Sequence, residues 1–326
     1  MRYSALLGLA SLATLVACGS AAPEVVAREQ RPTEVEVSVP TSRQRQRPRV
    51  VEGQLLTDRD TPLRGVLLPV DVGWYLADFE LMTELSESTG INAVHVYLEN
   101  YSHAPGAMQE AADALVALTA EAGLYLVLGI GGGSRNGSFT IEKVREFWTR
   151  YGARYGARTH VLFEIQNNPE LNCDVPFEPE TLALEREAYE LIRGVAPDSH
   201  ILLFSASSVP TAPVVEQGLS ALSDSVDFTN TSFAMHTDEV CTPPARYDEV
   251  LSALAPFQVP MLISQLPDTG WEPVMRQAEA LGIGWLHHQW LSEDQDLSTF
   301  RSALGSAKIS WCPDQGTYPE PAESCR

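Results

Sequence analysis

The stretch that decides the fold is Val161-Leu162-Phe163-Glu164-Ile165-Gln166-Asn167-Asn168-Pro169-Glu170. It begins with apolar residues, continues with polar side chains and stops at an Asn-Pro pair. Such an apolar run is typical of a strand buried on both faces in a parallel sheet, and proline ends it. The stretch therefore predicts a buried strand that carries polar groups to the rim of a sheet.

Seven further short runs of apolar or β-branched residues share this character. They span 65–70, 93–98, 125–130, 201–205, 231–235, 261–264 and 284–288. With 161–166, their starts lie about 23 to 40 residues apart, which is the length of a strand, a helix and two loops. Helical periodicity fills gaps at 107–122, 141–155, 181–195 and 272–281. Eight such units predict an α/β fold of the (β/α)₈ TIM-barrel type, with an open doubly wound sheet as the alternative.

The chain is acidic, and the charge is unevenly spread. Of its 326 residues, 22 are Lys or Arg and 43 are Asp or Glu, which gives a formal net charge of -21. Residues 63–326 account for this excess, with 14 basic and 36 acidic residues. An acidic surface repels phosphate backbones, so nucleic acid is not an expected partner.

The N-terminus has the features of an export signal. Met1-Arg2 supplies a positive start, and Ala5 to Ala17 form an apolar run too short to span a bilayer. The run ends Leu15-Val16-Ala17-Cys18-Gly19, which resembles the bacterial lipobox, whose cysteine is diacylated. This resemblance implies a signal peptide over 1–17, a membrane anchor on Cys18 and, because residue 19 is not Asp, an outer-membrane or surface location. The alternative is an ordinary signal peptide with a chance cysteine.

Four cysteines remain, namely Cys173, Cys241, Cys312 and Cys325. An even number in an exported chain predicts two disulfides, for which three pairings are possible. We favour Cys312–Cys325, which staples a C-terminal tail over 311–326, and Cys173–Cys241, which links two loops. The cysteine spacing does not favour a zinc site, and the sequence predicts no metal and no cofactor.

The remaining boundaries follow from composition. Residues 18–62 lack a hydrophobic period and are rich in Pro, Gln, Arg and Glu, which predicts a flexible tether. The barrel domain then spans 63–310. In a barrel of this type, ligands and reactive groups gather where the strands end.

The predicted strand ends are rich in amide, imidazole, acidic and aromatic side chains. They include Asp71, Trp74, His95, Glu99, Asn167, Asn168, Ser205, Ser207, His236, Asp238, Glu239, Gln265, Asp268, His287, His288, Gln289 and Trp290. Aromatic rings stack on the C–H faces of sugars, while amides and imidazoles bond the hydroxyls. This set therefore predicts an oligosaccharide or polysaccharide ligand.

The segment Phe163-Glu164-Ile165-Gln166-Asn167-Asn168-Pro169 resembles a strand end of the cellulase-like barrels of glycoside hydrolase family 5, aromatic-Glu-Ile-x-Asn-Glu-Pro. The resemblance covers 63–297. It implies that Asn167 bonds a sugar 2-hydroxyl and that His236 lines the cleft. His95 stands where the family has Arg, and His288 where it has Trp. With these residues, Trp74, Trp285 and Trp290 are expected to line the groove.

Two positions depart from the family pattern. Asn168 falls on the acid/base Glu, and Gln265 ends Pro260–Gln265, which resembles the strand that carries the nucleophilic Glu. A retaining glycosidase needs two carboxyl groups about 5 Å apart, one to protonate the leaving oxygen and one to attack. An amide has no titratable proton and is a poor nucleophile. The sequence thus predicts a pseudoenzyme that binds a glycan.

Two other interpretations stay open at this point. One is an active O-glycosyl hydrolase whose carboxylates are relocated to positions such as Glu99, Glu170, Asp174, Asp238, Glu239 or Asp268. The other is an envelope scaffold with no affinity for sugars, because a shared fold does not establish chemistry.

Overall fold

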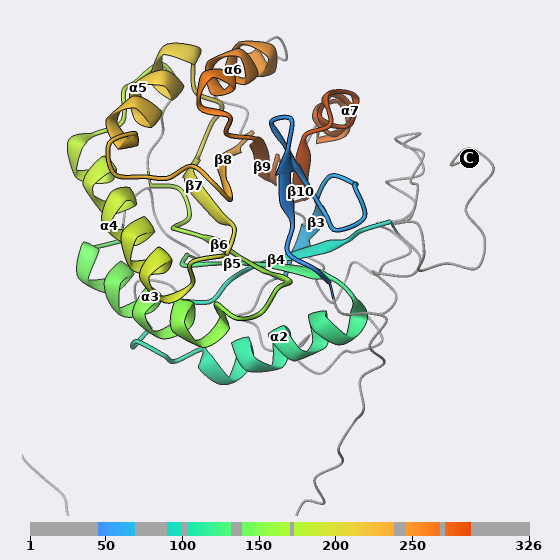
Figure 1. The fold of residues 1–326 in the computed structure, drawn as a ribbon, viewed down its shortest axis with the longest axis vertical. Coiled ribbons are helices and arrows are strands. Elements are labelled where there is room, and N and C mark those ends of the chain that lie inside the picture. The colour runs from blue at the N-terminus through green and yellow to red at the C-terminus, as the bar shows by residue number, and fades with distance from the viewer. Residues whose placement is uncertain are drawn as a thin grey trace, which may run out of the picture. The chain divides into compact units, whose positions relative to one another are not determined.

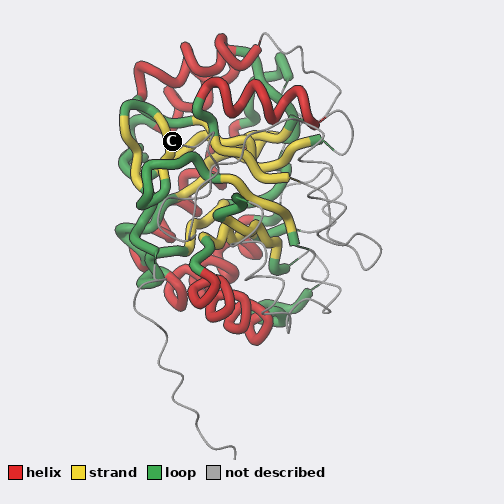
Figure 2. Tube along the Cα trace, turned by 90° about the vertical axis from the view of Figure 1, so that its right-hand side faces the viewer, coloured by secondary structure: helices red, strands yellow, loops and turns green. Residues whose placement is uncertain are grey.

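The computed structural model describes residues 45–68, 90–99, 103–131, 139–169, 173–237, 246–267 and 271–287. All of them belong to one compact unit. Eight parallel strands close into a barrel in the order β10-β3-β4-β5-β6-β7-β8-β9. The helices lie outside the strands (Figures 1 and 2). The predicted (β/α)₈ barrel is confirmed.

The barrel strands lie close to their predicted positions. They are β3 (Arg64–Leu67), β4 (Ala93–Tyr97), β5 (Tyr125–Gly129), β6 (Val161–Glu164), β7 (Ile201–Ala206), β8 (Thr231–His236), β9 (Met261–Leu266) and β10 (Gly284–His287). The helices are α2 (Gln109–Ala122), α3 (Ile141–Tyr155), α4 (Pro179–Val195), α5 (Ala212–Leu222), α6 (Arg246–Leu254), the short η3 (Ala255–Phe257) and α7 (Trp271–Leu281).

Alternation along each strand divides the core into an outer and an inner layer. On β6, Phe163 faces outward and packs edge-on against Trp148 of α3, with ring centroids 5.1 Å apart. Trp148 also donates its indole N–H to the carbonyl of Ile165 at 3.0 Å. The inner layer is apolar and contains Ala93, Tyr125, Val127, Leu162, Leu202, Ala234, Leu262 and Leu286. Because side chains alternate, Glu164 and Gln166 follow Leu162 into the interior.

Residues 45–62 close the N-terminal end of the barrel. They form a hairpin of β1 (Arg49–Val51) and β2 (Gln54–Leu56), and Leu55 joins the inner core. The Tyr125 hydroxyl, at the start of β5, donates to the Gln46 carbonyl at 2.8 Å and accepts from the Asp58 N–H at 3.0 Å. The predicted tether is therefore wrong over residues 45–62. Short strands and a polar composition hid this hairpin from a search for hydrophobic periods.

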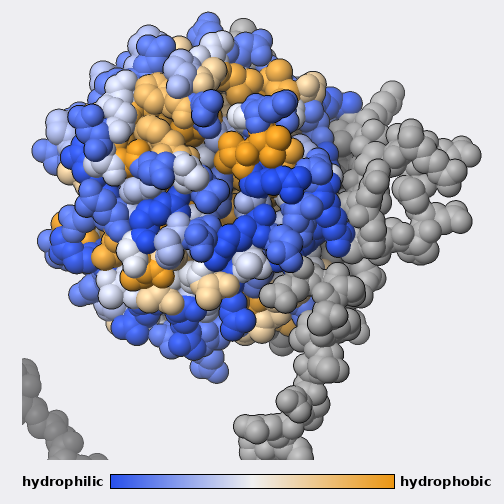
Figure 3. All heavy atoms as spheres, in the orientation of Figure 1, coloured by the Kyte–Doolittle hydropathy of each residue, from blue (hydrophilic) through white to orange (hydrophobic). Residues whose placement is uncertain are grey.

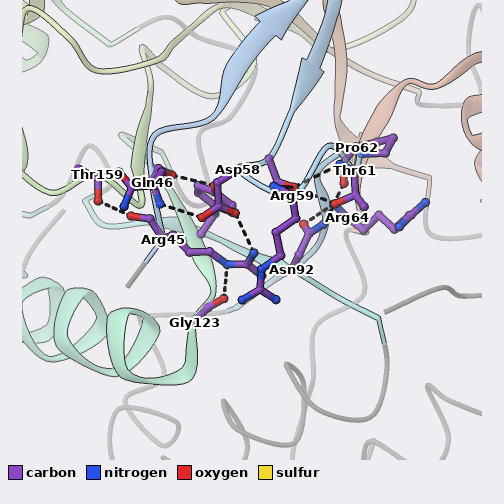
Figure 4. A network of polar contacts seen from close by, with 12 residues as sticks. Arg45, Gln46, Asp58, Arg59, Thr61, Pro62, Arg64, Asn92, Gly123 and Thr159 are labelled. Atoms are coloured by element: carbon purple, nitrogen blue, oxygen red, sulfur yellow. Dashed lines mark hydrogen bonds and ion pairs between the residues drawn. The ribbon is translucent and has the colours of Figure 1, made fainter. Parts of the chain in front are cut away.

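Arg45 anchors this closure. Its Nε donates to the Gly123 carbonyl at 2.6 Å, and its Nη1 lies 3.0 Å from Asp58 Oδ1 (Figure 4). The guanidinium also lies over the Tyr125 ring, 5.3 Å from its centroid. The Arg45 carbonyl accepts from the Thr159 hydroxyl. The closed end is thus built from directed polar contacts over an apolar layer.

In the described ranges, no helix combines the length and apolar character needed to cross a bilayer. The face seen in Figure 3 is largely hydrophilic, with separate apolar patches.

Several predicted sites lie outside the described residues. They are the signal peptide 1–17, Cys18, Trp74, Cys241, His288, Trp290, Cys312 and Cys325.

Candidate functional site

Strand β6 delivers a carboxylate to the centre of the barrel. Glu164, its last residue, is fully buried. Its Oε2 lies 2.5 Å from His95 Nε2 on β4, and its Oε1 accepts from the Ser205 hydroxyl on β7 at 2.5 Å. Gly129 on β5 leaves the space, because a Cβ there would lie 3.1 Å from Oε2. One carboxylate therefore joins strands on both sides of β6.

Glu164 is ionised in spite of its burial. Burial alone would raise its pKa, but the charge and hydrogen bond of His95, the charge of His236 and the Ser205 hydroxyl hold the pKa of Glu164 below its usual range. A buried carboxylate needs partners for its oxygens, and His95 and Ser205 supply them. The barrel interior therefore contains a compact charged cluster above the apolar layer.

Strand β7 is strained where it meets this cluster. Phe204 and Ser205 both lie in the left-handed region, with φ of 73° and 40°. The pairing of β7 with β8 shifts register between Leu203 and Ala206. Each such residue costs about 1–3 kcal/mol, and strain of this kind gathers at functional sites. The freed Phe204 N–H donates to Glu185 Oε2 on α4 at 3.0 Å, which stabilises the bulge from outside.

Past Glu164, the chain runs into three consecutive amides. Both polar atoms of Gln166 and the Oδ1 atoms of Asn167 and Asn168 are buried without a hydrogen-bond partner in the described structure. Asn168 also has a left-handed φ of 49°. An unpaired buried polar group costs about 1–3 kcal/mol, so a row of them marks a place where a ligand or water supplies the partner.

Asn167 is held tightly at this rim. Its backbone N–H donates to the Ile130 carbonyl at 2.9 Å. A Cβ on Gly131 would lie 2.5 Å from Asn167 Cβ and 3.0 Å from Tyr97 Cδ1. Glycine at 131, with φ of 158°, is therefore required for Asn167 and Tyr97 to approach the β5 end this closely.

Strands β8 and β9 contribute the other side of the rim. His236 ends β8 and is fully buried, and it pairs in register with Gln265 near the end of β9. The Gln265 carbonyl accepts from the Thr237 N–H at 3.0 Å and from its hydroxyl at 3.2 Å. The structure thus places Asn168 and Gln265 where β6 and β9 end, as the sequence predicts.

The prediction for Trp285 is wrong. Trp285 is fully buried, and its indole N–H donates to Glu279 of α7 at 2.8 Å. It faces outward because Leu286 faces the interior, and alternation sends the neighbouring side chain to the opposite face. Trp285 therefore packs the helix layer and does not line the groove.

Glu99 is not free to act as a relocated acid. Its side chain is fully buried and accepts from Lys143 Nζ at 2.8 Å, from the Tyr151 hydroxyl at 2.7 Å and from the Gly106 N–H at 2.6 Å. Lys143 and Tyr151 belong to α3, so the carboxylate is engaged outside the barrel interior. Glu170, Asp238, Glu239 and Asp268 lie outside the described residues.

Cys173 takes part in a disulfide. Its N–H donates to the Ser208 hydroxyl at 3.1 Å, which ties the segment after β6 to the segment after β7. Cys241 is not among the described residues, so the pairing of these two cysteines stays a prediction.

Sequence reasoning missed the roles of Glu164, Gln166 and Ser205. Glu164 was available as a signal, because an acidic residue at an inward position of an apolar strand requires a partner inside the barrel. The contact with Ser205 depends on the β7 bulge, which no local sequence pattern announces. Among the residues that the structure describes, no group of three or more His, Cys, Asp or Glu side chains is arranged to hold a metal ion.

A separate cavity of about 1010 Å³ lies at the closed end, between the hairpin and the segments 226–230 and 251–259. It borders the N-terminal ends of the strands. In barrels of this type that end serves stability, while chemistry occupies the other end. We therefore place the candidate site at the carboxyl ends.

The sequence matches no protein-family model and no curated protein. Solved structures do resemble it. A β-glucanase from Saccharophagus degradans has a TM-score of 0.61 at 16% identity, over 82% of this chain and 94% of that one. A glutamate-to-glutamine variant of a Thermobifida fusca endoglucanase, in complex with cellotetraose, has a TM-score of 0.60 at 16% identity, over 76% and 86%. A Thermomonospora fusca β-mannanase with mannohexaose has a TM-score of 0.57 at 19% identity, over 78% and 88%.

This chain shares their barrel fold. The structural neighbours are cellulases and mannanases of glycoside hydrolase family 5, which agrees with the resemblance seen in the β6 motif. At these identities the likeness establishes the cellulase-like barrel and leaves the activity to the residues of the site.

Proposed function

We propose that this chain binds a saccharide in the bacterial envelope through a cellulase-like barrel that has lost the two-carboxylate reaction. The observation that carries the proposal is the pair of amides, Asn168 and Gln265, at the ends of β6 and β9. Neither amide donates a titratable proton or attacks an anomeric carbon as a carboxylate does. Glu164 and Glu99 do not replace them, because each already has partners on both oxygens.

The unpaired amides support a hydroxylated ligand. Gln166, Asn167 and Asn168 offer buried acceptors without partners in the described structure, and sugar hydroxyls are suitable donors. Two of the structural neighbours are complexes with cellotetraose and mannohexaose. One of these carries glutamine in place of a glutamate, so this exchange is compatible with a bound oligosaccharide in that protein.

The envelope address is part of the same proposal. It is supported by the apolar run that ends in Leu15-Val16-Ala17-Cys18. Labelling cells with a clickable palmitate analogue tests it: the label should enter the wild-type chain and be lost in Cys18→Ala. Equal labelling of both chains would contradict lipidation at Cys18.

Binding and turnover are tested with the same sugars. Calorimetry with cellotetraose, mannohexaose and peptidoglycan fragments should show binding of at least one of them. Incubation with β-glucan, mannan and the same fragments should release no reducing ends above a heat-denatured control. Release of reducing ends would contradict the loss of catalysis and favour a hydrolase with relocated carboxylates. Absence of binding to every saccharide would favour the scaffold.

The double variant Asn168→Glu with Gln265→Glu tests whether the two amides cause the loss of hydrolysis. If only the two carboxylates are missing, the double variant should hydrolyse a saccharide that the wild type only binds. Each single variant is the matched control and should stay inactive, since the reaction needs both groups. A double variant that binds the sugar but does not cleave it would show that further parts of the site have changed.

A further inference from the structure

The cluster of Glu164, His95 and Ser205 lies below the amides, and folding alone does not require it. A buried ion pair is often no more stabilising than apolar residues of the same volume. Here Glu164 and His95 occupy the interior above an apolar layer. The fold also accepts two strained residues on β7 in order to direct Ser205 to Glu164. Two destabilising features, the buried pair with His95 and the strained residues of β7, thus surround the single carboxylate of Glu164.

Contacts continue from this carboxylate to the rim. The His95 ring meets the Tyr97 ring edge-on, with centroids 4.5 Å apart. Tyr97 and Asn167 both crowd Gly131, where an added Cβ would lie 3.0 Å and 2.5 Å from their atoms. The contacts therefore run from Glu164 through His95 and Tyr97 to Gly131, beside which Asn167, the amide predicted to bond the sugar, also lies.

We propose that Glu164 is the positioning residue of the saccharide site, fixing His95 and Ser205 beneath the amides and so setting the shape and charge of the floor below the ligand. This inference rests on the proposed function for the identity of the ligand, but the network itself does not depend on a ligand. The rim has amides where the related enzymes have carboxylates, and Glu164 is the acid retained at its floor.

The first test needs no ligand. An imidazole N–H held in a short, charge-assisted bond to a carboxylate gives a far-downfield proton signal in NMR spectra. The wild-type chain should show this signal. It should vanish in Glu164→Gln and in His95→Gln, and it should persist in Glu185→Gln. Its persistence in Glu164→Gln, or its absence from the wild type, would overturn the proposal.

The second test measures affinity for cellotetraose and mannohexaose. Glu164→Gln should weaken binding at least about tenfold, which corresponds to the loss of one charge-assisted contact network. Glu185→Gln is the matched control, because Glu185 is equally buried and stabilises the same bulge from the helix side. It should change affinity less than about twofold at a similar loss of stability.

Two variants of His95 distinguish a positioning role of the network from a packing role. His95→Gln retains an N–H for Glu164 and should keep more affinity than His95→Leu, which retains none. Equal weakening by Glu164→Gln and Glu185→Gln, or equal weakening by the two His95 variants, would reduce Glu164 to a structural role. If neither sugar binds the wild type while the downfield signal is present, the proposed function fails and the network stands.

Discussion

The two ends of the barrel treat their polar groups in opposite ways. At the closed end, Arg45, Asp58 and the Tyr125 hydroxyl form a connected network in which each polar group meets a partner. At the other end, where the strands reach their carboxyl termini (the carboxyl end), the amides of Gln166, Asn167 and Asn168 keep buried atoms without partners in the described structure. Left-handed residues occur at both ends, but those of the closed end, such as Asp60 and Asn230, lie in turns or bends, whereas Phe204 and Ser205 lie within strand β7 near the carboxyl end.

This difference indicates that stability and ligand binding depend on opposite ends of the barrel. Satisfied polar networks stabilise a fold and specify one arrangement, while unsatisfied or strained groups lower stability and persist where a ligand uses them. Substitutions at the closed end should therefore cost stability, and substitutions at the carboxyl end should cost function.

The largest effect is expected from Arg45→Ala. Removing this buried guanidinium leaves Asp58 and the Gly123 carbonyl without their partner and should lower the free energy of unfolding by about 3–5 kcal/mol. Urea denaturation measures the change. Arg49→Ala is the control, because its ion pair with Asp60 is exposed and should contribute less than about 1 kcal/mol. Similar losses in both variants would contradict the anchoring role of the buried Arg45 guanidinium.

A fall in pH should weaken the closed end of the barrel before the carboxyl end. Burial lowers the pKa of His160 to about 4 and that of His200 to about 3. Their unfolded pKa lies near 6.5, so the unfolded chain binds more protons and the free energy of unfolding falls as the pH drops below 6.5. Glu164 acts in the same direction only below its ordinary value of 4.5.

The variant His160→Gln isolates this effect, since it keeps an N–H for the Val116 carbonyl and does not titrate. Between pH 6.5 and 4.5, it should lose about 2–3 kcal/mol less stability than the wild type. Denaturation at a series of pH values checks it. A parallel pH dependence of wild type and His160→Gln would contradict the assignment.

Tyr125→Phe should have a moderate effect. The change removes one hydroxyl that bonds Gln46 and Asp58 and leaves both groups unpaired, which should cost about 2 kcal/mol. Tyr155→Phe is a suitable comparison, because that hydroxyl bonds the partly exposed Asp113. Thermal denaturation that ranks Tyr155→Phe as the more damaging change would be inconsistent with a closed end stabilised by this network.

The smallest change in stability, with the opposite sign, is expected from Gln166→Leu. Replacing an unpaired buried amide by an apolar side chain of similar size should be neutral or raise the free energy of unfolding by about 1 kcal/mol. The same variant should lose saccharide affinity in calorimetry. A clear loss of stability would show that Gln166 has partners in the folded protein and belongs with the satisfied groups of the closed end.

Most strands and helices of the barrel could be predicted, because apolar periodicity is a local property of the sequence. The α3 bounds match the predicted range, and each barrel strand overlaps its predicted run, since both depend on apolar periodicity. The hairpin segment over 45–62 was missed for two reasons. The hairpin has strands of only three residues, and its partners, such as Gly123 and Ser199, lie far away in the sequence.

The candidate site could be predicted only in part, because some of its contacts depend on residues that are far apart in the sequence. The positions of Asn167, Asn168, His95, His236 and Gln265 followed from strand ends, so the sequence was enough to find them. The contact between Glu164 and Ser205 depends on a register shift, and the outward direction of Trp285 depends on the exact phase of a four-residue strand. Pairing with the neighbouring strands decides which side chains of a short strand face inward, and the sequence of that strand alone does not contain this information.

The closure at residues 45–62 also bears on the order in which the chain assembles. Arg45 meets Gly123, and its carbonyl meets Thr159, which are 78 and 114 positions later. Arg47 reaches Ser199, 152 positions later. Contacts over such separations form after the intervening chain has folded, because closing long loops costs entropy before it is rewarded. The first segment of the barrel unit to leave the ribosome is thus one of the last to find its place, and it completes the barrel only when the start of β7 has arrived.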